Sequence, residues 1–211
     1  MVAAPPSPHT GEVRAPRTAD GHGGRTGEVR CKGSAITSRM RFLEERGGDA
    51  ARAAVLERLS PAFAERLEAG VLKNAWVPFD LFLALNEAID AELGQGDLAL
   101  CREMGRFGAR LNLPTVYRLF YKVGSLAFIL RRAPRVWAVH YSSGKLVVDT
   151  GRDWAKLRVE RFRRPHRALW LSVLGWAEAS AELSGTRLRE AELLTAPESL
   201  AEGACEMVLR W

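Results

Sequence analysis

The sequence predicts an α+β fold: a helical N-terminal half, then a four-stranded antiparallel sheet in the order β-β-α-β-β, with the helices packed on one face. Two patterns predict it. Apolar residues recur at helical spacing from about residue 38 to residue 141. Beyond that point apolar and polar residues alternate at 145–150, 155–162 and 205–211, as they do in half-buried strands.

The first 31 residues differ from the rest of the chain. They are rich in Pro, Gly, Thr and Arg, and the pentapeptide TGEVR occurs at 10–14 and again at 26–30. Such a segment has too few large apolar residues to offset the entropy lost on ordering. We therefore expect a disordered leader over 1–31 and a single α+β domain over 32–211. The repeated pentapeptide is either a partner-binding motif or a chance repeat.

Capping residues and helix breakers divide the helical half. Ser34 or Thr37 can cap the first helix, and the pair Gly47–Gly48 is expected to end it. Ser60 followed by Pro61 is typical of a helix start. The expected helices are 38–48, 49–59, 60–70, 78–94 and 97–112, followed by an apolar helical stretch over 115–141 with interruptions at Gly124 and Pro134.

Glycines inside two of the expected helices bear on how closely other elements pack against them. Gly105 and Gly108 lie inside the helix expected at 97–112, where each costs about 1 kcal/mol relative to alanine, so either a closely packed element or a kink is expected. The helix expected at 165–185 is apolar around most of its first half and should be buried on more than one side. One side meets the sheet, and the other meets another helix or a second subunit. Gly175 would allow a close crossing.

The strands follow from alternation. KLVVDT at 145–150 and AKLRVERF at 155–162 are joined by a short turn, which indicates an antiparallel hairpin. RLREAELL at 187–194 is a weaker strand. The core face of the last strand is expected to carry Cys205, Met207, Leu209 and Trp211.

Composition bounds the class of protein. The chain has 211 residues, of which 47% are hydrophobic and 27% charged, as in one globular domain. No apolar run approaches the roughly 18 residues of a membrane span, and no signal peptide is legible. Cys31, Cys101 and Cys205 are far apart and form neither a metal pair nor a disulfide framework. We therefore expect a cytoplasmic protein.

The formal net charge of +6 is unevenly distributed. Residues 102–167 carry 16 Lys and Arg against 4 Asp and Glu, a net charge of +12, whereas 33–101 and 168–211 each carry −4. This pattern indicates either charge pairing within the protein or an anionic partner, and we favour the pairing. Nucleic acid is the less favoured partner, because the arginines are scattered and no recognition-helix or RNA-binding signature is present.

Four segments carry a family resemblance: KGSAITSRMRFL, GRFGARLNLPTVYRLFYKVG, HRALWLSVLGWAE and the closing EGACEMVLRW. Across 32–211 they resemble the vinyl-4-reductase-type domain, in particular an uncharacterised bacterial branch of it. Its superfamily also holds the haem nitric-oxide-binding domains and the TRAPP subunits. Family members tend to close with the pattern matched here by Gly203, Cys205, Glu206 and the strand to Trp211.

The resemblance implies a sensor fold that binds a small molecule or lipid and is commonly a homodimer. Some related domains bind zinc through two cysteines, and the haem branch uses a histidine on a helix. Here no second cysteine precedes Cys205 in its segment, and neither His140 nor His166 lies in a recognisable haem motif. We therefore expect no metal and no cofactor.

The sequence contains no legible catalytic set. It lacks GxSxG, HExxH, a P-loop and a GxGxxG that opens a helix after a strand, so an enzyme is not expected. A candidate anion-binding site lies where the helix after Pro165 begins, because backbone N–H groups and the helix dipole favour negative charge there. Its residues would be Arg163, Arg164, His166 and Arg167. The alternative is a solvated arginine-rich loop.

Aromatic residues at helical spacing are either plain core or the lining of an apolar pocket. The ligand-pocket residues that we predict are Phe82, Asn86, Phe107, Tyr117, Phe120, Tyr121, Trp137 and Trp176. Three functions remain open. The first is a non-enzymatic sensory domain for a small hydrophobic molecule or lipid, which signals through a dimer or partner. The second is a TRAPP-like scaffolding module without a ligand, and the third a binder of an anionic partner through 102–167.

Overall fold

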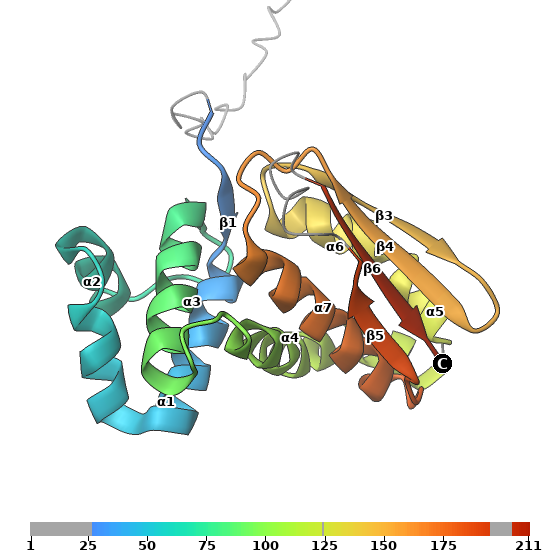
Figure 1. Ribbon diagram of the computed structural model, residues 1–211, viewed down its shortest axis with the longest axis horizontal. Helices are drawn as coiled ribbons and strands as arrows, with labels where there is room; N and C mark the ends of the chain where they lie inside the picture. The colour runs from blue at the N-terminus through green and yellow to red at the C-terminus, as the bar shows by residue number, and fades with distance from the viewer. Residues whose placement is uncertain (1–26, 124, 195–203) are drawn as a thin grey trace, which may run out of the picture.

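The computed structural model describes residues 27–123, 125–194 and 204–211, and for 114–123 it describes the backbone alone. Its helices are α1 (Gly33–Glu57), α2 (Pro61–Glu68), α3 (Phe79–Leu93), α4 (Leu100–Val123), α5 (Leu126–Leu130), α6 (Ala133–His140) and α7 (Arg167–Leu183). Its strands are β1 (Arg30–Lys32), β2 (Trp76–Pro78), β3 (Lys145–Thr150), β4 (Trp154–Glu160), β5 (Glu190–Leu193) and β6 (Cys205–Arg210). The predicted α+β order is confirmed (Figure 1).

The larger sheet has the strand order β3-β4-β6-β5, and each neighbouring pair is antiparallel. Its inner face is apolar: Leu157 is paired with Met207 and Val159 with Cys205, and all four side chains are buried. The outer face carries ion pairs instead. The predicted alternation of β4 and β6 is therefore confirmed, and Trp211 is half-buried against the same core.

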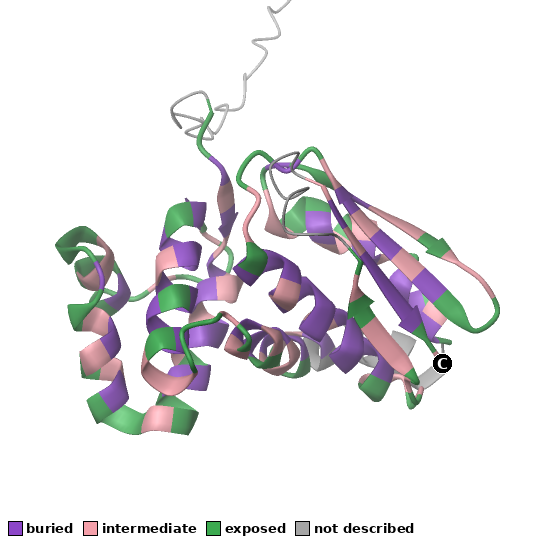
Figure 2. Ribbon diagram, in the orientation of Figure 1, coloured by how far each residue is buried: buried purple, intermediate pink, exposed green. Residues whose placement is uncertain are grey.

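Helix α7 is the most deeply buried helix, as Figure 2 shows by its mostly purple ribbon. One side packs against β5 and β6, and α4 runs along the other side (Figure 1). Trp170 is completely inaccessible to solvent within the single chain. The second surface of this helix therefore meets another helix and does not require a second subunit. The burial of α7 therefore no longer supports a homodimer, and the homodimer stays a prediction.

The folded part of the chain begins earlier than we predicted. Arg30–Lys32 form β1, which pairs with β2, and the Cys31 side chain is fully buried opposite Val77. The backbone carbonyl oxygen of Arg30 also accepts a hydrogen bond from the N–H of Ser142 at 3.0 Å. A leader over 1–31 is thus too long. The partner strand lies about 45 residues away, so local composition could not reveal the pairing.

Helix boundaries were predicted with three differences. Helix α1 begins at Gly33 with Lys32 at its N-cap, so neither Ser34 nor Thr37 caps it as we had expected. Gly48 has a left-handed φ of 63° and breaks α1 where the glycine pair was expected to end a helix, but the two segments remain joined. Helix α4 continues past Pro114 to Val123 as one helix, where we had expected two segments. Pro61 begins α2 and Gly94 follows the end of α3, as predicted. Among the described residues, no helix is long and apolar enough to cross a membrane.

Candidate functional site

A cavity of about 290 Å³ lies between α1, α4, α6 and α7. Most of its wall is apolar and comes from short side chains on these helices and from one residue of β3: Ala35, Ala109, Leu113, Val136, Leu146 and Val173. Its volume is close to the lower limit of about 300 Å³ for pockets that hold small ligands. The cavity is therefore the candidate functional site.

The polar groups on the wall come mainly from α1, α6 and α7. Arg39 and Ser38 belong to α1, Ser172 to α7, and His140 and Tyr141 lie at the end of α6. Burial raises the pKa of the Tyr141 hydroxyl above its ordinary value, which keeps that group neutral at physiological pH. A largely apolar wall with a few polar groups is the usual composition of a ligand site.

His140 has one ring nitrogen already engaged. Its Nδ1 lies 2.8 Å from the backbone carbonyl oxygen of Val136, one helical turn earlier. A carbonyl oxygen can only accept, so Nδ1 carries the hydrogen of this bond, and Nε2 is the ring nitrogen that the bond does not use. His140 therefore has the orientation of a hydrogen-bonding or metal-binding histidine.

Glycines allow two walls of the cavity to approach closely. A Cβ atom added at Gly175 would lie 1.9 Å from the carbonyl oxygen of Arg102, and one added at Gly105 would lie 2.1 Å from that of Ser172. Neither position tolerates a side chain. The backbones of α4 and α7 are thus in contact, which is one of the two alternatives predicted for the glycines of α4, the other being a kink. The third glycine, Gly108, faces Arg39, with its added Cβ 3.2 Å from Nη1.

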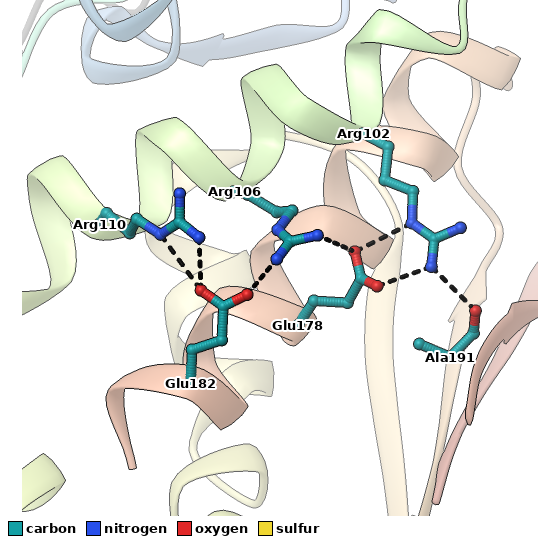
Figure 3. A network of polar contacts seen from close by, with 6 residues as sticks. All are labelled: Arg102, Arg106, Arg110, Glu178, Glu182 and Ala191. Carbon is teal, nitrogen blue, oxygen red and sulfur yellow. Dashed lines mark hydrogen bonds and ion pairs between the residues drawn. The ribbon is translucent and has the colours of Figure 1, made fainter. Parts of the chain in front are cut away.

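Paired charges hold α4 and α7 together beside this crossing (Figure 3). The arginine ladder consists of Arg102, Arg106 and Arg110 on α4 with Glu178 and Glu182 on α7. Arg102 donates two hydrogen bonds to Glu178, at 2.9 and 2.6 Å. Arg110 contacts Glu182 at 2.6 Å, and Arg106 contacts both glutamates. The ladder confirms internal pairing between the basic centre and the acidic end of the chain for these three arginines.

The predicted pocket residues divide into three groups. Trp137 and Trp176 line the cavity. Phe82, Asn86 and Phe107 lie outside its wall: Asn86 accepts a hydrogen bond from Arg39, Phe82 lies 5.0 Å from the same guanidinium, and Phe107 packs edge-on against Phe42. The side chains of Tyr117, Phe120 and Tyr121 lie outside the described residues.

The predicted anion site is already bonded to neighbouring groups. Nδ1 of His166 accepts the N–H of Ala168 at 3.2 Å and so caps α7, while its Nε2 lies 3.2 Å from a carboxylate oxygen of Glu87. Arg164 contacts Asp80 at 2.9 Å, Arg163 contacts Ser143, and Arg167 is exposed. The structure brings the four residues together, and anion binding there stays a prediction.

Sequence reasoning missed Arg39, although a signal was present. Ile36 lies three residues before it and Leu43 four residues after it, and both are fully buried. Residues at this spacing share one face of a helix, so the arginine stands in the apolar face of α1. A charged residue in the middle of such a face is uncommon and predicts a specific partner.

The cysteines are not reactive groups of this site. Burial raises the pKa of the Cys31 and Cys101 thiols to about 12, so neither is a thiolate at neutral pH. Cys205 is buried on the inner face of the sheet. The described residues contain no cluster of three or more side chains suited to hold a metal ion.

No protein-family model matches the sequence, and a search of curated proteins finds no match. Solved structures do match in fold. An Fe(II) unliganded H-NOX protein from K. algicida has a TM-score of 0.67 and 13% identity, with 85% of this chain and 95% of that chain covered. An oxygen-binding H-NOX domain related to soluble guanylate cyclases has a TM-score of 0.60 and 13% identity, with 85% and 93% covered.

The chain therefore has the haem-NO-binding (H-NOX) fold. The fold expected from the resemblance is confirmed, whereas membership of the superfamily and of its vinyl-4-reductase branch stays a prediction. At 13% identity the likeness shows the fold alone.

Proposed function

We propose that the chain is a non-enzymatic ligand-binding and sensory domain. It takes a small, largely hydrophobic molecule or lipid in the cavity between α1, α4, α6 and α7, and it relays occupancy through a homodimer or a partner protein. The observation that carries the proposal is the cavity itself: about 290 Å³ of mostly apolar space with polar groups from α1, α6 and α7. The fold of ligand-binding H-NOX proteins supports it.

Haem, the ligand that the fold family implies, is not the ligand that we propose. His140 is a described histidine on the cavity wall and is oriented by Val136, so an iron ligand of the right type is present. The space is the obstacle. A porphyrin with two propionates is larger than a drug-sized molecule, while the cavity lies at the lower limit of about 300 Å³ for such ligands. The residues present fit a smaller molecule.

Two other functions have less support. A scaffolding module would present apolar helix faces to a partner, but the apolar helix α7 is buried inside the chain. A binder of nucleic acid would need free basic side chains, whereas Arg102, Arg106 and Arg110 in the basic centre are bonded to glutamates.

The test uses a neutral dye and a matched pair of variants on α6. Val136 lines the cavity, and Ala138, two residues later, is exposed. Nile red should fluoresce with the wild type, and native mass spectrometry should detect a co-purified molecule. Val136→Phe should fill the cavity and weaken dye binding about tenfold or more, which corresponds to about 1.4 kcal/mol. Ala138→Phe should bind the dye like the wild type.

Two results would contradict the proposal. The first is a wild type that binds no dye and has only the mass of the bare chain. The second is equal dye binding by Val136→Phe and the wild type. Addition of hemin should leave the Soret band of free hemin unchanged, and a shifted, sharpened band that saturates at one equivalent would show that the cavity opens for haem.

A further inference from the structure

Arg39 is a charged side chain buried in the wall of the cavity. Only 5% of the residue is exposed to solvent. Its Nη2 donates a hydrogen bond to Ser172 Oγ at 2.8 Å, its Nε donates to Asn86 Oδ1 at 3.2 Å, and its Nη1 lies 3.4 Å from Ser38 Oγ. These groups come from α1, α3 and α7. They hold the guanidinium in one orientation.

All three partners of Arg39 are neutral and are themselves fixed by the backbone. The hydroxyl of Ser172 donates to the carbonyl oxygen of Ala168 at 2.7 Å, and that of Ser38 donates to Ala35 at 3.0 Å. The amide of Asn86 donates to Phe82 at 2.6 Å. The two hydroxyls have used their single donor, and Asn86 directs its carbonyl oxygen at Arg39, so all three partners accept from the guanidinium. They orient its charge without neutralising it.

No acidic side chain balances this charge within the described part of the chain. No Asp or Glu oxygen there lies within 4.0 Å of the Arg39 guanidinium. Burial lowers the pKa of Arg39, yet an arginine does not lose its proton in a protein. A buried cation without a counter-ion is unfavourable, and such groups are normally paired. The missing anion must therefore come from outside these residues.

The cavity supplies a route for that anion. Arg39 is part of its wall, and Gly108, which has no side chain, lies close to Nη1. The three hydrogen bonds to described residues use three of the five N–H donors of a guanidinium. Two donors are left, which is the number that a carboxylate accepts in a bidentate pair. The rest of the wall, including Leu113 and Val173, is suited to hydrocarbon.

We propose that Arg39 binds the carboxylate of an amphiphilic monoanion, such as a short or medium-chain fatty acid, whose hydrocarbon part occupies the apolar side of the cavity. This inference rests on the proposed function, because it names the ligand class of the same cavity. A monocarboxylate balances the single buried charge. A phosphate monoester would bring a second negative charge, and the described residues contain no second buried lysine or arginine to meet it.

The first experiment compares ligands on the wild type and needs no variant. Octanoate and octanol have the same hydrocarbon chain and differ in the head group. In displacement of Nile red at about pH 7.5, octanoate should bind about tenfold or more tightly than octanol, because a guanidinium–carboxylate pair is charge-assisted. Octyl phosphate should bind more weakly than octanoate. Equal binding of octanoate and octanol would overturn the inference, as would tighter binding of octyl phosphate.

A second experiment uses variants of two arginines on α1. Arg39→Met keeps an unbranched, flexible side chain and removes the charge. It should bind Nile red and octanol like the wild type but lose the preference for octanoate. Arg41→Met is the control, because the Arg41 side chain is 60% exposed and pairs only with Glu45 among the described residues. It should keep the preference. An octanoate preference retained in Arg39→Met would overturn the inference.

The outcomes separate this inference from the proposed function. If Nile red and octanol bind and octanoate has no advantage, the cavity is a ligand site but Arg39 is not its anion-binding group. If no probe binds the wild type, both proposals are wrong. If Arg39→Met does not fold, Arg39→Lys replaces it, and the loss of bidentate geometry should reduce the octanoate preference.

Discussion

Two kinds of arginine site lie on either side of the same helix pair. In the arginine ladder, Arg102, Arg106 and Arg110 are partly exposed and each contacts a glutamate. Arg39 is almost fully buried and contacts only neutral groups among the described residues. The ladder has the arrangement of a structural contact. The Arg39 site has the arrangement of a preorganised binding group. Its guanidinium is fixed in one orientation, and no acidic side chain among the described residues balances its charge.

The comparison also shows that solvent exposure changes how much stabilisation an arginine gains from an anionic partner. Surface ion pairs stabilise a protein by about 0–1 kcal/mol each, since water already solvates both partners. A buried arginine has lost that solvation and gains far more from an anion. The same residue type can therefore join two helices in one place and select a ligand in another.

The largest effect is expected at the helix crossing beside the ladder. Gly175→Ala would place a Cβ atom 1.9 Å from the Arg102 carbonyl oxygen, and the backbone must move to accept it. We expect a loss of about 2 kcal/mol or more in the free energy of unfolding, measured by urea denaturation. Gly108→Ala is the matched variant at the Arg39 site. Its nearest contacts are side-chain atoms at 3.1 and 3.2 Å, so its stability should change by less than about 1 kcal/mol. Equal losses would show that backbone contact does not distinguish the two sites.

A smaller loss is expected when the ladder loses an acid. Glu178 accepts two hydrogen bonds from Arg102, and its side chain is 12% exposed. Glu178→Gln should lower the free energy of unfolding by about 1–2 kcal/mol. Urea denaturation at low and at high salt measures it. A loss that does not shrink at high salt would indicate lost packing instead of lost charge pairing.

Removal of the buried Arg39 side chain should preserve or raise the free energy of unfolding, in contrast to the loss expected for Glu178→Gln. In Arg39→Met the unbalanced charge disappears, and the cost is the loss of the hydrogen bonds to Ser172, Asn86 and Ser38. We expect the ligand-free protein to keep its stability within about 1 kcal/mol or to gain stability. Thermal denaturation of ligand-free protein is the measurement. A loss of about 3 kcal/mol would place Arg39 with the structural arginines of the ladder.

The smallest effect is the pH dependence that Glu182 of the ladder contributes. Burial alone would raise the pKa of Glu182, but hydrogen bonds from Arg110 and Arg106 outweigh burial and lower it below its ordinary value of 4.5. Its stabilising contribution is therefore complete above about pH 4.5 and is lost as the pH falls through the lowered value. The urea midpoints of the wild type and Glu182→Gln should differ at about pH 7 and converge below about pH 4. A difference that persists at low pH would contradict the pairing.

The fold could be predicted largely from the sequence, because its signals are local. Three local patterns predicted how the elements pack. They are the alternation in β4 and β6, the glycines of the helix crossing and the apolar residues around most of α7. The strand β1 could not be predicted, because Cys31 is paired with Val77 and Arg30 is hydrogen-bonded to Ser142, and both partners are distant in the chain. Composition marked residues 27–31 as leader, and only the pairing corrects this.

The site was harder to predict than the fold. Trp137 and Trp176 were found because large aromatic residues attract attention, yet Phe82 and Phe107 have the same signal and lie outside the cavity wall. Helical spacing shows that a side chain points inward. It does not show whether the space in front of it is filled. The cavity depends instead on small residues in its wall, such as Ala109, and on the buried polar side chain of Arg39.

The position of β6 bears on how the chain is made. It lies between β4 and β5, although it follows both in the sequence. As the polypeptide leaves the ribosome, the β3–β4 hairpin emerges first, and the edge of β4 that will pair with β6 has no partner until residue 205 and beyond have emerged. An open edge with an apolar face is a site for pairing with other chains. During synthesis, the protein therefore depends on β6 to close a strand edge that is otherwise open to aggregation.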